Sequence, residues 1–471
     1  MRASAVRRTI GIVAAGLALV TFGTAAARPG AAAAGEAAAH PPMGWNSYDA
    51  YGTTVTEAQF RANALWMSRH LKRYGWRYVV IDAEWFARNP TPSGNSAGEI
   101  LVLDRYGRYV PAPNRFPSTA HGAGLRSLAD YVHSLGLRFG IHILRGIPKE
   151  AVARNLPIEG SPYTAAQAAD VHAACPWNPD NYGVAQGPAG QAYYDSIARL
   201  YASWGVDFIK ADCIASHPYA GGEIRMLATA LRRSGRNMIL SLSPGPAPLA
   251  KLAQLRRYAG MWRISNDVWD LWHSSASYPQ GVGDQFQRAA RWAPLAEAGH
   301  WPDADMLALG ELRPAPGWGP PRRTRLTRAE QRTYVTLWCI ARSPLFMGGN
   351  LTEMDPWTLS LLDDPEVIAV DQRSVDAHQA FSSAGTSVWL SRPRTAPRPG
   401  RPGWYLAVFN LKDRTRTIRL PWSALSLTGS RYALRDLWRR RNIGTAELLR
   451  VRLPAHGAAL YRVRPDRDQE R

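Results

Sequence analysis

The chain has 471 residues, of which 46% are hydrophobic, and its formal net charge at neutral pH is +20. This length predicts two domains with cores of ordinary size. The positive charge comes mainly from arginines scattered through every segment, because the chain has only five lysines. No basic helix with interleaved aromatic residues is evident, so the composition argues against nucleic acid as a partner.

The N-terminal segment has the pattern of an export signal. An arginine pair at 7–8 precedes an apolar stretch at 10–22, and three alanines at 25–27 suit cleavage. Because the apolar stretch is too short for a membrane span, residues 1–27 are predicted to be a signal peptide. Export would follow the Sec route, or the twin-arginine route that the paired arginines permit. Residues 28–40 are predicted to be a disordered spacer, and the mature protein is expected to be secreted, with no membrane attachment.

Three cysteines occur in the chain, at Cys175, Cys213 and Cys339. In an exported protein, an odd number predicts one disulfide and one buried thiol. Cys213 directly follows Asp212, and Cys175 lies in a loop-like segment. We therefore expect a disulfide between Cys175 and Cys213.

From residue 41 onward, segments with the pattern of strands alternate with segments with the pattern of helices. The predicted strands are 43–47, 78–82, 138–144, 205–213, 238–245, 261–267, 301–307 and 343–349. The predicted helices are 56–72, 124–135, 191–204, 223–234, 248–258, 285–298 and 327–341. Eight such repeats fit a (β/α)8 TIM barrel over residues 41–372 better than an open doubly wound sheet. No Gly-x-Gly-x-x-Gly opens a helix, so a nucleotide-binding fold has no support.

Two further features complete the organisation of the chain. The long loop 88–117 interrupts the barrel pattern and is expected to contribute to the rim of a site, and 145–187 is predicted to be another long, loop-rich insert. After about residue 372 the pattern changes to short strands separated by turn-rich sequence, such as those at 386–390 and 404–409. Residues 373–471 are therefore predicted to form an antiparallel β-sandwich domain.

Three of the predicted barrel strands have an acid as their last or next-to-last residue, namely Asp82, Asp212 and Asp267. Asp212 follows Lys210 at the end of one strand, and Asp267 ends another. The carboxyl ends of barrel strands carry the chemistry of barrel enzymes. Alone, Asp212 could simply pair with Lys210 on one face of the strand. Two carboxylates on the same face, however, are what a retaining glycosidase needs, since one attacks the anomeric carbon and the other moves protons.

These segments resemble glycoside hydrolase family 27, the α-galactosidase and α-N-acetylgalactosaminidase family, over nearly the whole chain after the predicted signal. The likeness lies in short motifs that occur in the same order. They are Pro41-Pro42-Met43-Gly44-Trp45-Asn46-Ser47, Ile81-Asp82 with Trp85, Gly205-Val206-Asp207 with Lys210-x-Asp212, Trp262-Arg263 with Asp267, Trp301-x-Asp303-x-Asp305-Met306-Leu307, and Ser343-Pro344-Leu345 with Gly348. The resemblance implies a (β/α)8 barrel, a C-terminal β-sandwich and hydrolysis with retention at the anomeric carbon.

By position, the resemblance implies that Asp212 is the nucleophile and Asp267 the general acid/base. A nucleophile must stay ionised, and Lys210 on the same strand face would lower the pKa of Asp212. A general acid must hold its proton until the substrate arrives. A negative neighbour and a less solvated, apolar setting around Asp267 are expected to favour this.

The resemblance also implies a set of sugar-binding residues. Arg263 matches a substrate-contacting arginine whose planar donors suit vicinal hydroxyls, or it forms an ion pair that holds the barrel top. Lys210 either contacts a sugar hydroxyl or forms a structural ion pair. Tyr48 stands where the family has a stacking tryptophan, and His142 where it usually has tyrosine. Asp82 matches the first of two adjacent acids that hold hydroxyls remote from the anomeric carbon.

The chain departs from the family around these positions. Ala83 follows Asp82 where the family has its second acid, and Glu84 falls on the other face of an extended strand. Ser243-Pro244-Gly245 replaces a Cys-Glu-Trp run that shapes the pocket near the second sugar carbon. The catalytic pair is thus retained, while much of the sugar-recognition shell has changed.

The expected function is hydrolysis of terminal α-D-galactosyl residues of oligo- or polysaccharides. The close alternative is the same mechanism on another glycone: a β-L-arabinopyranoside, an α-N-acetylgalactosaminide or an isomalto-oligosaccharide. The remote alternative is a non-catalytic carbohydrate-binding protein, which would have no use for both acids. No cofactor is expected, and no His/Asp spacing argues for a metal.

Overall fold

The computed structural model of the chain describes Met1 and residues 38–91, 98–312, 320–394 and 403–466. Residues 2–27 of the predicted signal peptide and 28–37 of the predicted spacer lie outside this part of the chain. Ala38 is buried, and its carbonyl oxygen accepts hydrogen bonds from Trp301 Nε1 at 2.7 Å and from Gly299 N at 2.9 Å. The last residues of the predicted spacer therefore pack against the barrel.

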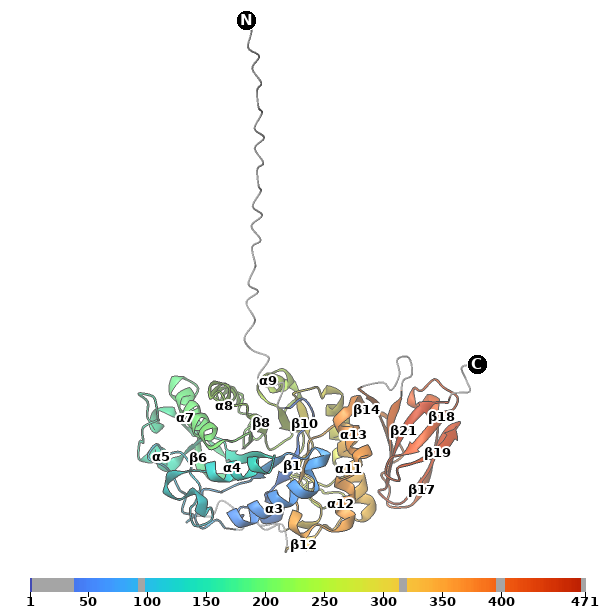
Figure 1. The fold of residues 1–471 in the computed structure, drawn as a ribbon, viewed down its shortest axis with the longest axis horizontal. Coiled ribbons are helices and arrows are strands. Elements are labelled where there is room, and N and C mark those ends of the chain that lie inside the picture. Colours follow the sequence, from blue (N-terminus) through green and yellow to red (C-terminus); the bar gives the residue numbers. More distant parts are fainter. Residues whose placement is uncertain (2–37, 92–97, 313–319, 395–402, 467–471) are drawn as a thin grey trace.

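Eight parallel strands form the predicted barrel (Figure 1). In spatial order they are β10 (Trp301–Asp303), β9 (Met261–Arg263), β8 (Ile239–Leu242), β7 (Phe208–Asp212), β3 (Arg138–Leu144), β2 (Tyr78–Ile81), β1 (Met43–Asn46) and β13 (Leu345–Met347). The two ends of this sheet are joined by hydrogen bonds from Leu307 N to Phe346 O at 2.7 Å and from Gly348 N to Leu307 O at 3.0 Å. The sheet is thus a closed (β/α)8 barrel, as predicted.

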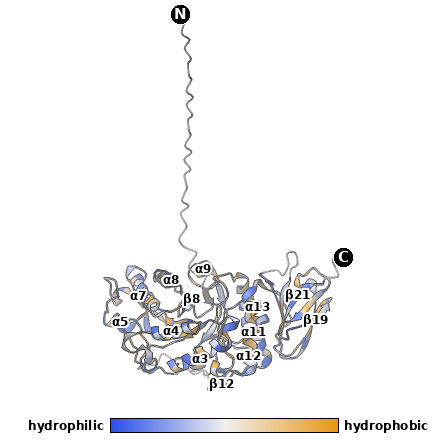
Figure 2. Cartoon of the chain, viewed as in Figure 1, coloured by the Kyte–Doolittle hydropathy of each residue, from blue (hydrophilic) through white to orange (hydrophobic). Residues whose placement is uncertain are grey.

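Helices surround the barrel strands in Figure 1. Those that follow the predicted pattern are α3 (Glu57–His70), α4 (Arg126–Ser134), α7 (Pro188–Trp204), α8 (Gly221–Arg233), α9 (Leu252–Tyr258), α10 (Gln285–Trp292) and α11 (Arg328–Ala341). Helices α3 and α4 carry both hydrophobic and hydrophilic residues in Figure 2, as expected when one face packs on a core. Thr327 and Glu330 form a reciprocal capping box at the start of α11, which holds this end of the helix in place.

The segment 145–187 contains more regular structure than the loop-rich insert that the sequence predicts. It holds a three-stranded sheet and two short helices. These elements are β4 (Ile147–Pro148), α5 (Lys149–Ala153), α6 (Ala165–Ala168), β5 (Ala169–Cys175) and β6 (Asn178–Val184). Its strands lack a regular apolar alternation, and the register of β5 against β6 is irregular, which explains why the sequence pattern did not indicate them.

The C-terminal domain is the predicted antiparallel β-sandwich. One sheet contains, in order, β14 (Ser374–Ser383), β15 (Thr386–Pro393), β16 (Trp404–Asn410), β21 (Ala458–Pro465), β18 (Tyr432–Asp436) and β19 (Arg441–Ala446). The other pairs β17 (Arg416–Pro421) with β20 (Leu448–Leu453). Buried side chains of both sheets, including Leu406, Ile418 and Leu449, form one apolar cluster.

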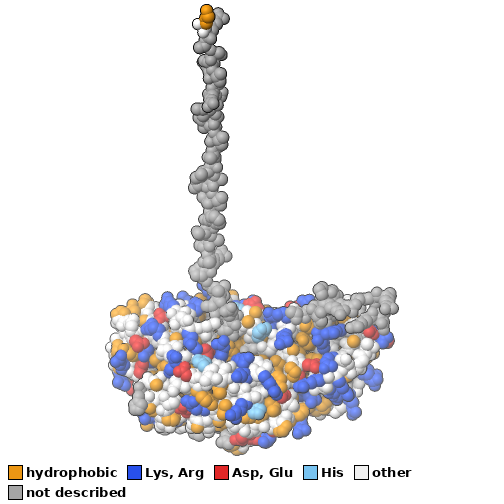
Figure 3. Space-filling model, viewed as in Figure 1, with side chains coloured by type: hydrophobic (Ala, Val, Ile, Leu, Met, Phe, Trp, Pro, Cys, Tyr) orange, Lys and Arg blue, Asp and Glu red, His pale blue; other side chains and the backbone are white. Residues whose placement is uncertain are grey.

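The sandwich packs on the barrel through aromatic rings. Phe286 of α10 contacts Phe409 of β16 with ring centroids 4.9 Å apart, and Trp272 stacks on His456 at 4.0 Å. Lysine and arginine side chains are spread across the visible face of both domains in Figure 3 rather than gathered in one stripe. Within the described ranges, no helix has the length and apolarity needed to span a membrane.

Candidate active site

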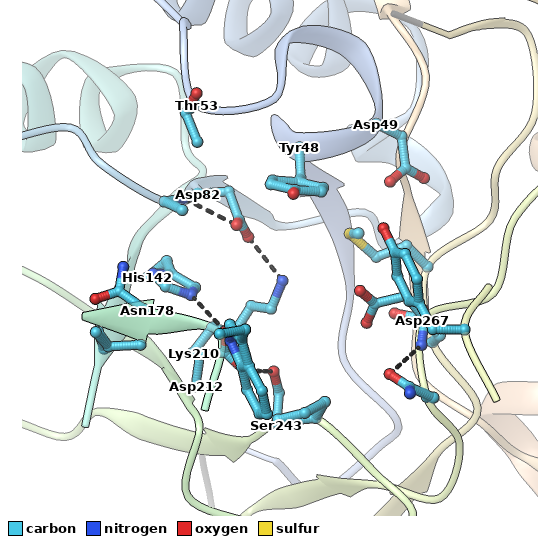
Figure 4. A pocket seen from close by; sticks show the side chains of 18 of the residues that line it. Tyr48, Asp49, Thr53, Asp82, His142, Asn178, Lys210, Asp212, Ser243 and Asp267 are labelled. Atoms are coloured by element: carbon cyan, nitrogen blue, oxygen red, sulfur yellow. Dashed lines mark hydrogen bonds and ion pairs between the residues drawn. The ribbon is translucent and has the colours of Figure 1, made fainter. Parts of the chain in front are cut away.

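A cavity of about 670 Å³ lies at the carboxyl ends of the barrel strands (Figure 4). Most of its lining comes from residues at or just after the ends of β1, β2, β3, β7, β8, β9 and β10, and the turn between β5 and β6 adds the rest of one side. Six of the seven predicted catalytic and sugar-binding residues line it: Tyr48, Asp82, His142, Lys210, Asp212 and Asp267. The cavity therefore occupies the position where barrel enzymes carry out their chemistry.

Asp212 ends β7 at the cavity wall, and two side chains hold its carboxylate. Ser243 Oγ donates a hydrogen bond to Asp212 Oδ1 at 2.9 Å, and His142 Nε2 lies 3.5 Å from Oδ2. Burial alone would raise the pKa of Asp212, but the hydrogen bond and charge of His142, together with Lys210, hold it well below its usual range. Asp212 is therefore a carboxylate that stays ionised, as a nucleophile must.

Lys210 pairs with Asp82 rather than with Asp212. Its Nζ lies 2.8 Å from Asp82 Oδ2, which also accepts a hydrogen bond from Asn46 Nδ2 at 2.6 Å. Burial opposes the charge of both partners, but their mutual attraction lowers the pKa of Asp82 and raises that of Lys210. Lys210 Nζ also lies 5.9 Å from the centre of the Tyr48 ring. Of the two alternatives for Lys210, the structure shows an ion pair, but its partner is Asp82 and not Asp212. The pair places polar groups of both residues on the cavity wall (Figure 4).

Asp267 lies on the more open side of the cavity. Its side chain is 39% exposed, whereas that of Asp212 is 21% exposed. The expectation of a less solvated setting is therefore wrong. The reason is that β9 ends at Arg263, so Asp267 lies four residues further along, in the segment that leads to the rim.

Arg263 lies beneath the cavity rather than in its wall, and it is buried. Its Nη2 donates to Asp267 Oδ1 at 3.1 Å, and its Nη1 lies 2.8 Å from Asp305 Oδ1. Asp305 Oδ2 in turn accepts a hydrogen bond from Val268 N at 2.7 Å. This arrangement matches the ion-pair alternative for Arg263, in which the guanidinium fixes the position of Asp267.

Two buried acids at the site were not singled out as functional from the sequence. Asp49 follows Tyr48 on α2 (Tyr48–Tyr51), and Asp305 belongs to the quoted motif after β10. Burial raises the pKa of Asp49, and the charge of Asp305 adds to the effect. Burial also raises the pKa of Asp305, against the opposing charge of Arg263. The sequence motif that contains Asp305 could have pointed to a functional role for this acid. No sequence pattern marks Asp49, because only the fold brings it into the cavity wall.

The predicted disulfide between Cys175 and Cys213 is confirmed, and Cys339 is a buried free thiol in α11, as expected. The disulfide joins the end of β5 to the residue directly after Asp212. The small sheet of the 145–187 insert is therefore fastened to the strand end that carries Asp212.

One group of acids could hold a metal ion by distance alone. The carboxylates of Glu84, Glu99 and Asp180 lie within 4.8 Å of one another. Protein cations already act on this group. Glu84 and Glu99 oppose the effect of burial on the pKa of Arg115. Burial raises the pKa of Asp180, and the nearby charge of Lys149 opposes this rise. The arrangement of Asp212 and Asp267 does not involve these acids.

Comparison with known proteins gives matches over both domains. The family described as "Alpha galactosidase A" matches residues 180–373, and "Alpha galactosidase C-terminal beta sandwich domain" matches residues 394–463. Among curated proteins, alpha-galactosidase A of Cellvibrio japonicus is 26% identical over 90% of this chain and 92% of its own. The alpha-galactosidase of Coffea arabica is 28% identical over 90% of this chain and 94% of its own.

Two solved structures are more similar. A β-L-arabinopyranosidase of glycoside hydrolase family 27 from Geobacillus stearothermophilus is 42% identical, with a TM-score of 0.86, over 93% of this chain and 99% of its own. A putative α-N-acetylgalactosaminidase from Bacillus halodurans is 38% identical, with a TM-score of 0.78, over 91% of this chain and 98% of its own. The chain therefore belongs to glycoside hydrolase family 27 and is an O-glycosyl hydrolase.

Proposed function

We propose that the protein is a retaining glycosidase in which Asp212 is the nucleophile and Asp267 the general acid/base. The observation that carries this proposal is the contrast between two carboxylates of one cavity. His142 and Lys210 keep Asp212 ionised by lowering its pKa, and Ser243 donates a hydrogen bond to it. Asp267 is open to solvent and held by Arg263. The first setting suits attack on carbon, and the second suits exchange of protons with a leaving group and with water.

The reaction proceeds in two displacements. Asp212 attacks the anomeric carbon while Asp267 gives its proton to the glycosidic oxygen, so the bond from carbon to the leaving oxygen breaks and a glycosyl ester of Asp212 forms. Asp267, now a carboxylate, then takes a proton from a water molecule as that water attacks the same carbon. The ester bond breaks, Asp212 leaves as a carboxylate, and the sugar retains its anomeric configuration.

The glycone that we propose is β-L-arabinopyranose, which has the ring configuration of α-D-galactose but lacks the exocyclic carbon. Ala83 lines the cavity beside Asp82, at the position where the family resemblance places a second acid. A methyl group offers no hydrogen bond to an exocyclic hydroxyl, and a pentopyranose does not require one. The name of the Geobacillus relative supports the same glycone.

Terminal α-D-galactosyl residues are the second candidate, because the curated relatives are named alpha-galactosidases. The discriminating experiment measures kcat/KM of the full chain for an aryl β-L-arabinopyranoside, α-galactoside, α-N-acetylgalactosaminide and α-glucoside. We expect the arabinopyranoside to be the best substrate, and Ala83→Asp to shift the preference toward the α-galactoside by supplying the missing acceptor. A wild type that prefers the α-galactoside would overturn the choice of glycone. Asp212→Ala is the inactive control.

Export from the cell is a further part of the proposal. It is supported by the N-terminal sequence pattern and by the disulfide between Cys175 and Cys213, since disulfides persist in oxidising compartments. N-terminal sequencing of protein recovered from the medium should begin near residue 28. Retention of an uncleaved chain inside the cell would contradict export.

A further inference from the structure

Two aromatic side chains at the cavity stand out by their exposure. Trp177 is 39% exposed and Tyr278 is 42% exposed, and both line the cavity. Every other phenylalanine, tryptophan and tyrosine in the described ranges is buried or half-buried. Large rings are normally covered, so exposed ones that gather at a single cavity indicate a surface that a ligand covers.

Each ring is fastened beside one of the two carboxylates. Trp177 lies in the turn between β5 and β6, two residues after Cys175, whose disulfide partner Cys213 directly follows Asp212. The turn that carries Trp177 is thus covalently linked to the Asp212 side of the cavity.

Tyr278 is held on the opposite side by the backbone around Asp267. Gln280 N donates to Asp267 O at 2.8 Å, and Trp269 N donates to Gln280 O at 3.0 Å. Asn266 Nδ2 also donates to Ser277 O at 3.1 Å. These bonds close the segment that carries Tyr278 against the residues on either side of Asp267.

The position of the rings points to the leaving group rather than to the glycone. Of the two polar groups implied to hold the glycone, Asp82 is buried in the cavity wall and the side chain of Lys210 is only 15% exposed. Both rings are solvent-exposed at the cavity, and Tyr278 lies on the side of Asp267, the carboxylate that would protonate the leaving oxygen. His217 is also exposed there, with its ring centre 6.5 Å from that of Trp177, and it can offer a hydrogen bond to a hydroxyl.

We propose that Trp177 and Tyr278 form a subsite that holds the first sugar of the leaving group, a pyranose ring that packs its C–H faces against the two aromatic rings. Tryptophan and tyrosine suit this task because they bury a large apolar area at a low cost in conformational entropy. The inference rests on the proposed function, and it assigns the contacts of the first leaving-group sugar to these two side chains.

The experiment compares two substrates that share one glycone. In the disaccharide the leaving group is a pyranose, whereas in the glycosyl fluoride it is a single atom that cannot reach the rings. For Trp177→Ala and Tyr278→Ala in the full chain, we expect kcat/KM for the disaccharide to fall roughly 3- to 10-fold. For the fluoride, we expect a loss below about twofold, because stacking on the leaving group is absent from that reaction. Trp177→Phe and Tyr278→Phe keep a ring and should retain most of the disaccharide activity.

Leu249→Ala is the matched control, since Leu249 is also exposed but does not line the cavity. Equal losses on both substrates, unchanged disaccharide activity in the alanine variants, or phenylalanine variants as impaired as the alanine ones would each overturn the subsite. A wild type that hydrolyses neither substrate would instead overturn the proposed function itself, and the subsite with it. The two failures are therefore distinguishable in one set of measurements.

Discussion

The two sides of the cavity differ in how they hold a carboxylate. On one side, Asp212 ends a barrel strand and receives a hydrogen bond from Ser243, with His142 and the Asp82–Lys210 pair beside it. On the other, Asp267 lies beyond its strand, half-exposed, with Arg263 below. On the enclosed side, the surrounding groups keep Asp212 ionised and hold its carboxylate in a fixed position. The open side lets a carboxylate meet a leaving group and water in turn, so the same functional group acquires two roles from its surroundings.

The largest difference between the sides should appear in Asp267→Ala. Without a proton donor, we expect kcat/KM for the disaccharide to fall about 10²- to 10⁴-fold. The glycosyl fluoride should lose far less in kcat/KM, because fluoride leaves without being protonated. Equal losses on the two substrates would contradict the assignment of Asp267 as the acid, and Asp212→Ala should abolish both reactions.

The enclosed side depends on its buried ion pair. Lys210→Met leaves the carboxylate of Asp82 buried without its cation, and we expect the free energy of unfolding to fall by about 3–5 kcal/mol. Arg233→Met is the matched control, because its pair with Asp195 lies at the surface and should contribute below about 1 kcal/mol. Denaturant unfolding at neutral pH measures both. A similar loss of unfolding free energy in the two variants would show that the Asp82–Lys210 pair stabilises the fold no more than a surface ion pair does.

The pH dependence of the reaction should respond to His142. The hydrogen bond and charge of His142 lower the pKa of Asp212 against the effect of burial. Because the nucleophile acts as the carboxylate, activity is lost as the pH falls through this pKa. His142→Phe removes the interaction and raises the pKa, so the acidic limb of the kcat/KM profile should move to higher pH. An acidic limb that stays in place would mean that His142 does not control the ionisation of Asp212.

The smallest effect is expected at Asp49, whose pKa is raised by burial and by Asp305. In the unfolded chain, Asp49 loses its proton above its ordinary pKa of about 4. In the folded protein, Asp49 keeps this proton to higher pH. The free energy of unfolding of the wild type therefore falls as the pH rises above about 4. Asn cannot lose this proton. The stability of Asp49→Asn relative to wild type should therefore increase from pH 5 to pH 8, as measured by thermal unfolding. A difference that does not change with pH would exclude a raised pKa.

The regular elements of the barrel could be predicted because their sequence signals are local. The strand β7 lies within the predicted 205–213, and α11 lies within the predicted 327–341. The strands β5 and β6 were missed because they carry mixed, partly exposed residues and pair irregularly. Their apolar pattern is therefore no stronger than that of a loop.

The site could be predicted only in part. The positions of Asp212 and Asp267 at the carboxyl ends of strands follow from the barrel, and so does their presence in one cavity. The choice of Asp82 as the partner of Lys210 depends on the packing of β2 and β7 across β3, which no local pattern contains. The solvation of Asp267 was predicted wrongly because the sequence did not show that β9 ends at Arg263.

The most direct test of the account is to identify the residue that attacks the sugar. A cyclitol epoxide with the galactose ring configuration reacts with an attacking carboxylate, which opens the epoxide and forms a stable ester on that residue. Peptide mapping by mass spectrometry of the labelled full chain then locates the ester. We predict a single label on Asp212. A label on Asp267 or another residue, or no label on a protein that hydrolyses its glycoside, would contradict the assignment of the nucleophile.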